Sequence, residues 1–166
     1  GIRDLVRSRG LGDVYKRQPV FEAINKITSP DIISDFELTG WQRVDRNYQK
    51  VLKALNHASV EEDYQSIGLL CRELHISLAQ AVYVPELHSS VDGIVPSSTD
   101  SKRMLENYIN SKLSGREFEQ HRKLLKSTLD LAIALQHKRT ANAVDAKLCV
   151  EATTSLKNLL LILSNG

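Results

Sequence analysis

Apolar side chains recur every three or four residues along most of the chain after residue 38, the spacing of one face of an α-helix. The first such stretch begins at Thr39, whose spacing to Gln42 is that of a capping box. Its apolar stripe consists of Trp41, Val44, Tyr48, Val51, Leu52 and Leu55. We therefore expect an amphipathic helix with one buried face.

The second helical stretch is apolar on nearly all sides, so we expect it to occupy the centre of the fold. Ser59 and Glu62 predict its start by a capping-box spacing, and Pro85 predicts its end. Its main face consists of Tyr64, Ile67, Leu70, Cys71, Leu74, Leu78, Ala81 and Val82, with Leu69, Ile76 and Tyr83 on the opposite side. Residues 85–97, which contain Asp92-Gly93, predict the only long loop.

Three further helices follow the loop. The third is capped by Ser97 or Ser98 and stopped by Gly115, the fourth covers about 116–136, and the fifth about 142–163. Their predicted inward residues are Met104, Leu105, Tyr108, Ile109 and Leu113, then Phe118, His121, Leu124, Leu125, Thr128, Leu129, Ala132 and Leu135, then Leu148, Cys149, Ala152, Leu156, Leu159, Leu160 and Leu163. Five amphipathic helices with mostly short connections predict an all-α, five-helix up-and-down bundle over residues 39–166.

The first 18 residues do not follow this pattern. They end in Asp13-Val14-Tyr15-Lys16-Arg17-Gln18, which resembles the in-frame translation of a transposase adaptor used to build sequencing libraries. We expect residues 1–18 to be foreign to the protein and residues 19–38 to be a leader. The remaining 148 residues carry 17 basic and 18 acidic side chains, so their net charge is −1 rather than the +2 of the whole chain. Global charge therefore gives no argument for a nucleic-acid or membrane partner.

Several classes of protein are disfavoured by the composition. The longest apolar run, residues 159–163, is far shorter than the roughly 18 residues of a membrane span. Cys71 and Cys149 lie in apolar helical patterns, which indicates free thiols and a reducing, cytoplasmic location. Cys71 and His75 have the i, i+4 spacing of two metal ligands, but no second pair completes a site, so we expect both to pack in the core. We expect neither a metal ion nor a cofactor, since no phosphate-binding glycine loop or metal-binding motif is present.

The polar junction between the last two predicted helices is the best candidate for chemistry. Its residues are His137, Lys138, Arg139, Thr140 and Asn142. At the start of the last helix, Asn142 and Asp145 fall on the apolar face, where polar groups need partners or line a pocket. Structural roles are the alternative: Asn142 suits a helix cap, Asp145 an acid in the first turn, and the cations Lys138 and Arg139 a helix C-terminus.

A five-helix bundle with a His-bearing polar turn before its last long helix resembles the HEPN superfamily. Its members are metal-independent RNases or non-catalytic partners of nucleotidyltransferases, common in bacterial toxin–antitoxin and defence systems. The resemblance covers the architecture of about residues 39–164 and implies either a helical interaction and regulatory module or an endoribonuclease. The family motif is an Arg and a His with four to six residues between them. Arg116 and His121 match it, whereas His137 has no Arg at that spacing.

In the catalytic alternative, the resemblance implies RNA cleavage by attack of a 2′-hydroxyl on the adjacent phosphate. His137 would be the acid/base, Arg139 would bind the phosphate and Asn142 would orient the groups. Arg116 and His121 form the rival pair. Lys138, Thr140 and Asp145 would line the pocket.

The chain also carries more apolar residues than one small bundle can bury. Val150, Leu161 and Ile162 lie off the main stripe of the last helix, and the second helix is apolar on two sides. We therefore expect a homodimer or a complex with a partner protein. RNA is the expected ligand of the catalytic alternative, and no membrane partner is expected.

Overall fold

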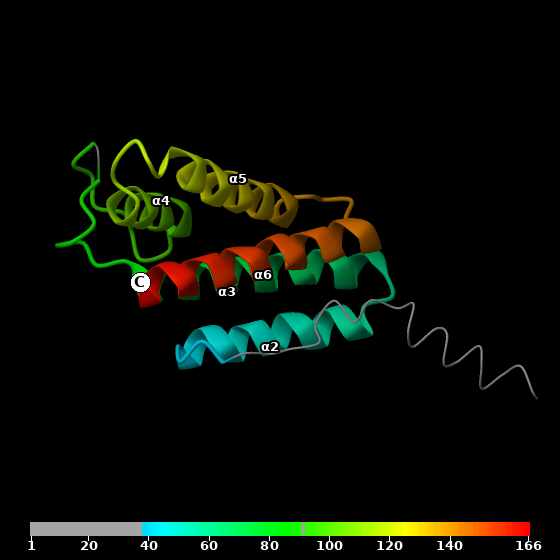
Figure 1. Ribbon diagram of the computed structural model, residues 1–166. Helices are drawn as coiled ribbons and strands as arrows, with labels where there is room; N and C mark the ends of the chain where they lie inside the picture. Colours follow the sequence, from blue (N-terminus) through cyan, green and yellow to red (C-terminus); the bar gives the residue numbers. More distant parts are fainter. Residues whose placement is uncertain (1–37, 91) are drawn as a thin grey trace, which may run out of the picture. The chain divides into compact units, whose positions relative to one another are not determined.

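The computed structural model describes residues 38–90 and 92–166, so the adaptor-like segment 1–18 and the leader, apart from Leu38, lie outside the described residues. Within this part every regular element is an α-helix (Figure 1). The helices are α2 (Gln42–His57), α3 (Glu61–Val82), α4 (Ser101–Lys112), α5 (Glu119–Gln136) and α6 (Ala143–Asn165). The predicted all-α class is thus confirmed for residues 38–90 and 92–166.

The helix α3 is central because it contacts each of the other four helices. The pairs α2–α3 and α5–α6 are antiparallel, while α3 and α6 run side by side in the same direction (Figure 1). The predicted central position of α3 is therefore confirmed, although Leu69, on the side opposite the main face, is 62% exposed. The largest fully buried side chains of this helix are Ile67, Leu74, His75 and Leu78.

Two predicted capping boxes use a different acid from the one expected. At the start of α2, the backbone N and the hydroxyl of Thr39 both donate to Oδ1 of Asp45, at 2.9 and 2.8 Å. At the start of α3, the backbone N of Ser59 donates to Oδ2 of Asp63 at 2.9 Å. The predicted boxes, which used a Gln and a Glu, are wrong because an Asp further into each first turn supplies the charged acceptor.

The helices after the long loop begin later than predicted. The cap of α4 is Asp100 rather than either preceding serine, and its Oδ1 accepts a hydrogen bond from the backbone N of Arg103 at 3.1 Å. The start of α5 is Glu119, three residues after the predicted one. Gly115 has a φ of 110°, a conformation that favours glycine, and residues 116–118 continue as a turn before the helix begins.

Three of the residues predicted to face inward are instead exposed. Leu124 is 56% exposed, Leu148 is 49% exposed, and His121 also lies at the surface. Conversely, Val150, predicted to lie off the main stripe of α6, is completely buried. The buried face of α6 is rotated from the predicted one because this helix contacts α2 as well as α3 and α5.

A buried polar cluster connects α3, α5 and α6 inside the bundle. His75 is completely buried, and its Nδ1 accepts a hydrogen bond from the side-chain N of Gln136 at 2.6 Å. Its Nε2 lies 3.1 Å from Oγ1 of Thr153. Burial lowers the pKa of His75 to about 4, so the ring is neutral at pH 7. Cys71 and Cys149 are buried free thiols, and the predicted core packing of Cys71 and His75 is confirmed.

A second histidine holds the loop that follows α3. His88 is buried, and its Nδ1 accepts a hydrogen bond from the backbone N of Val84 at 2.9 Å. Its ring stands edge-on to Tyr108 of α4, with centroids 5.0 Å apart. Burial and the nearby Lys112 lower the pKa of His88. The sequence indicated only a loop here, because Tyr108 lies 20 residues further along the chain.

Candidate functional site

Three polar residues at the α5–α6 junction, Lys138, Asn142 and Asp145, are bonded to one another. Lys138 Nζ lies 2.7 Å from Oδ1 of Asp145. Asn142 caps α6: its Oδ1 accepts from the backbone N of Asp145 at 3.0 Å, and Oδ2 of Asp145 accepts from the backbone N of Asn142 at 3.2 Å. The Lys138 ammonium, followed by the Asn142 backbone, lowers the pKa of the Asp145 carboxyl. Each of these three residues therefore has a structural role.

The junction is also attached to α3. The side-chain N of Gln65 donates to the backbone O of Arg139 at 2.6 Å. Three residues further along α3, a Cβ added to Gly68 would lie only 3.1 Å from the backbone O of Gln136, so a glycine allows the two backbones to approach closely. The hydrogen bond between Gln136 and His75 is a third attachment. These contacts hold the last turn of α5 in place.

Three predicted site residues line one shallow hollow at the junction, with a volume of about 450 Å³. The residues that line it are His137, Lys138 and Arg139, together with Gln136 of α5 and Gln65 and Leu69 of α3. The structure thus brings an imidazole and a guanidinium to one depression in the surface. Thr140, Asn142 and Asp145 do not line this hollow; Thr140 is exposed, and the other two form the cap of α6.

The rival pair lies at the opposite end of α5. Arg116 belongs to the turn before the helix and His121 to its first turn, and both are exposed. The ring of His121 contacts the Phe118 ring edge-on, with centroids 5.7 Å apart. Because α5 rises about 1.5 Å per residue, His121 and His137 are separated by roughly 24 Å. The structure does not bring the two histidines together.

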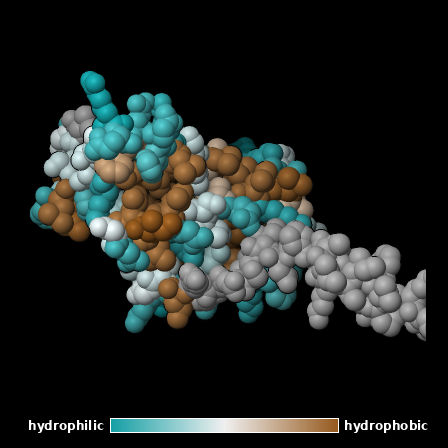
Figure 2. All heavy atoms as spheres, in the orientation of Figure 1, coloured by the Kyte–Doolittle hydropathy of each residue, from teal (hydrophilic) through white to brown (hydrophobic). Residues whose placement is uncertain are grey.

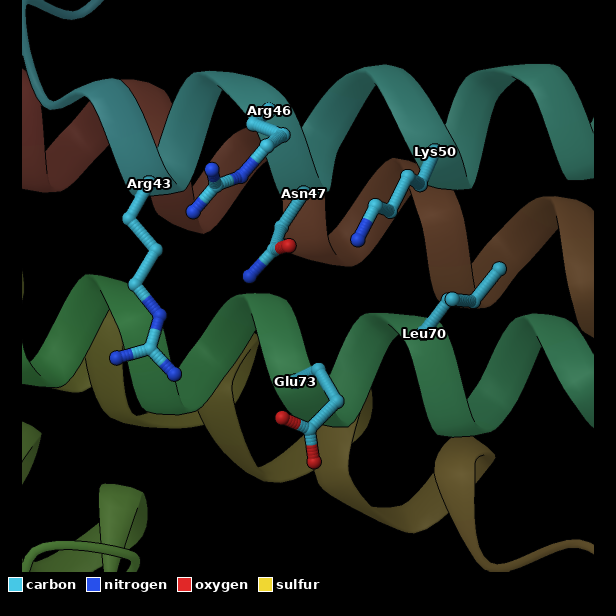
Figure 3. Close-up of a pocket in the computed structure, with 6 residues that line it drawn as sticks. All are labelled: Arg43, Arg46, Asn47, Lys50, Leu70 and Glu73. Carbon is cyan, nitrogen blue, oxygen red and sulfur yellow. The ribbon is translucent and has the colours of Figure 1, made fainter.

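A basic groove between α2 and α3, which sequence reasoning missed, has a volume of about 380 Å³. Its lining residues are Arg43, Arg46, Asn47 and Lys50 of α2 and Leu70 and Glu73 of α3. Figure 3 shows the side chains of α2 extending over α3, with the Glu73 carboxylate below them. The spacing of the cations at positions 43, 46, 50 and 53 could have indicated this groove, because it places them on one helical face.

Few interactions within the described residues engage the cations of this groove. Nη1 of Arg43 donates to Oε1 of Gln80 at 3.0 Å, but Arg43, Arg46 and Lys50 form no ion pair in the described part of the chain. The only acidic residue of α2 is Asp45, which is buried and bonded to Thr39. The exposed face of α2 therefore carries basic and neutral polar side chains and no acidic one.

No three His, Cys, Asp or Glu side chains of residues 38–90 and 92–166 are grouped so that they could hold a metal ion. In the same ranges, no helix combines the length and the apolar content needed to cross a membrane. Comparisons of the chain with protein-family models, with curated proteins and with solved structures return no match. The residues and their geometry therefore have to indicate what this chain does.

Proposed function

We propose that this chain is a helical interaction module that associates with a second copy of itself through an apolar surface on α5 and α6. The observation that carries the proposal is the set of large apolar side chains left exposed on these two helices. They are Leu124 (56% exposed) and Leu131 (50%) of α5, and Val144 (63%), Leu148 (49%) and Ile162 (69%) of α6. Figure 2 shows hydrophobic atoms gathered over α5 and α6 on the face turned to the viewer.

The packing of α5 against α6 makes this surface suitable for association. The two helices pack extensively against each other, and both carry exposed apolar side chains. Covering a half-exposed Leu or Val contributes about 1 kcal/mol, so five such side chains favour self-association by about 5 kcal/mol before the entropic cost of association. Of the residues predicted as apolar surplus, Val150 is buried within the bundle, whereas Ile162 remains on the surface.

The resemblance to the HEPN superfamily supports a regulatory role for such a module. In that superfamily, non-catalytic helical bundles act as partners in bacterial defence and toxin–antitoxin systems. The all-helical architecture and the long last helix after a polar junction are the features that support placing this chain in a system of that type.

Sedimentation velocity tests the proposal. The chain would be examined from about 1 µM to about 200 µM, beside a variant with Leu131→Glu and Leu148→Glu, which places charges in the proposed interface. We expect a concentration-dependent dimer for the parent and a monomer for the variant. Leu87→Glu is the matched control, because Leu87 is 69% exposed but lies in the loop after α3. A parent that stays monomeric over the whole range would contradict the proposal.

A metal-independent endoribonuclease is the second candidate function. It is supported by the hollow that His137 and Arg139 share, since an imidazole and a guanidinium are the groups that could move a proton and bind a phosphate. Asn142, predicted to orient these groups, caps α6 instead. An RNA-cleavage assay in EDTA separates the two functions. Cleavage by the parent that is lost in His137→Ala but kept in His121→Ala would support the enzyme, and intact RNA supports the module.

A further inference from the structure

A row of four cations lies along α2, and three of them, Arg43, Arg46 and Lys50, line the basic groove between α2 and α3. Arg43, Arg46, Lys50 and Lys53 follow one another at intervals of three or four residues, so they lie on one face of α2. At about 1.5 Å per residue this row extends roughly 15 Å along the helix axis. All four side chains are exposed. The row therefore presents a long and uniformly positive surface.

Within residues 38–90 and 92–166, few interactions engage these charges. Along the row, the neighbour three or four residues away is another cation, an arrangement that destabilises a helix. Elsewhere in the bundle some cations are paired: Lys102 lies 2.8 Å from Asp130, and Lys123 lies 2.7 Å from Glu119. Repulsion along the groove, by contrast, would be relieved by an anionic ligand.

The groove has a fixed shape, because a short chain of hydrogen bonds connects its two helices. The side-chain N of Asn47 donates to Oγ of Ser77 at 2.8 Å, and that hydroxyl donates to the backbone O of Glu73 at 2.9 Å. Asn47 lies between the cations of α2 in the view of Figure 3. A ligand would therefore meet cations that are already arranged along a held helix.

We propose that this groove binds the phosphodiester backbone of a nucleic acid without reading its bases. Guanidinium and ammonium groups are the donors that suit phosphate oxygens. With one phosphate every 3.4 Å along each strand of a duplex, a row of roughly 15 Å spans about four phosphates. The lining residues include no aromatic side chain that could stack on a base. The groove cations would contact phosphate groups and not bases, so binding should show no base preference.

A membrane surface is a poorer fit to the same face. None of the large exposed apolar side chains belongs to α2, so this helix has no residue to insert among lipid chains. Its outward residues are all polar: Gln42, Arg43, Arg46, Gln49, Lys50, Lys53, Asn56 and His57. The proposal is independent of self-association through α5 and α6, since it rests on residues of α2 and α3 alone.

Fluorescence anisotropy of a labelled oligonucleotide, measured with the full chain over a range of salt concentrations, tests the proposal. The groove variant carries Arg43→Gln, Arg46→Gln and Lys50→Gln. The matched control carries Lys112→Gln, Lys126→Gln and Lys147→Gln, which remove the same charge from residues that do not line the groove. A third variant, with Arg43→Lys, Arg46→Lys and Lys50→Arg, keeps the charge. Circular dichroism and urea unfolding establish that each variant is folded.

We expect the parent, the control and the charge-retaining variant to bind with similar affinity and a steep salt dependence. The groove variant should bind at least about tenfold more weakly at low salt, with a salt slope smaller by about 2 to 3, since three phosphate contacts are lost. RNA and DNA of several sequences should be affected equally. Equal binding by the groove variant and the control, or no binding by the parent at low salt, would overturn the proposal. So would tighter binding of polyglutamate or of anionic vesicles than of the oligonucleotide.

Discussion

At the α5–α6 junction the ammonium of Lys138 lies 2.7 Å from the Asp145 carboxylate, whereas Arg46 and Lys50 in the α2–α3 groove form no ion pair in the described part of the chain. Both regions are polar, basic and hollowed. In the junction, however, side chains and backbone groups bond to the cap of α6 and to α3. In the groove, the contacts between α2 and α3 leave the cations of the row at the surface.

The difference shows that polar residues close together in sequence are weak evidence for a site until their partners are known. A cap or an ion pair satisfies a polar group within the protein, and its removal then costs stability. Unpaired cations contribute nothing comparable to the fold, so their removal should affect binding instead. The predictions below test this contrast between a structural junction and a groove that is free to bind.

The largest expected effect is at His75, which holds the end of α5 from beneath the junction. His75→Ala leaves the side chains of Gln136 and Thr153 without their buried partner and opens a cavity, so the free energy of unfolding should fall by about 3 kcal/mol. Urea unfolding at pH 7 measures the change. His121→Ala, at an exposed histidine, is the control and should change stability by less than about 0.5 kcal/mol. A loss below about 1 kcal/mol at His75 would contradict its structural role.

Lowering the pH should weaken the packing of the buried His75 in the unmutated protein as well. The folded-state pKa of His75 is about 4, below the roughly 6.5 of an unfolded chain, so the unfolded state takes up the proton first as the pH falls. The stabilisation that the neutral, buried His75 ring provides is complete above pH 6.5 and is lost toward pH 4. Between pH 7 and pH 5 the loss should be about 2 kcal/mol.

The pKa of His88 is also lowered, so this residue contributes in the same direction. Urea unfolding of the parent, His75→Gln and His88→Gln at several pH values separates the two contributions. We expect the free energy of unfolding to depend less on pH in His75→Gln than in His88→Gln, because the His75 ring is completely buried. Equal slopes in the parent and in His75→Gln would show that the histidine is not responsible.

A smaller effect is expected at the cap of α6. Asn142→Ala removes the acceptor for the backbone N of Asp145 and should lower the free energy of unfolding by about 1 kcal/mol. Asn158→Ala on the exposed side of the same helix is the matched control and should change it by less than about 0.5 kcal/mol. Thermal unfolding of the three proteins provides the comparison. If both substitutions have the same small effect, the junction is less structural than the hydrogen bonds indicate.

The smallest effect on stability is expected in the groove. Glu73→Gln removes the one carboxylate that lines the groove. The free energy of unfolding should change by less than about 0.5 kcal/mol, whereas oligonucleotide affinity should rise by about threefold. Glu62→Gln, an exposed acid in the first turn of α3, removes the same charge outside the groove and should leave affinity unchanged. A rise of equal size in both variants would indicate a general charge effect.

The fold could be predicted from the sequence wherever a residue's role depends on near neighbours in the chain. The two-sided apolar pattern correctly predicted that α3 is central, and the structural alternative for Asn142, a helix cap, is the role that the structure shows. Leu148 and Leu124 were placed inward because periodicity identifies an apolar face but not which flank a neighbouring helix covers. His75 was correctly placed in the core, yet its partners lie 61 and 78 residues away and follow from tertiary packing alone.

The candidate site was less predictable for the same reason. The sequence drew attention to the junction because its polar residues adjoin one another, but it could not show that Lys138 bonds to Asp145. The groove was overlooked because each cation of α2, taken alone, resembles any solvated surface residue. Only the structure shows that α3 places a single carboxylate, Glu73, in that groove.

One incubation of the full chain with end-labelled RNA in EDTA tests the central claim, that the groove binds and the junction is structural, most directly. A native gel measures binding, and a denaturing gel of the same sample measures cleavage. We expect RNA that is bound by the parent, released by the groove variant and intact in both samples. Cleaved RNA that becomes intact in His137→Ala would contradict the claim and identify the junction as an active site.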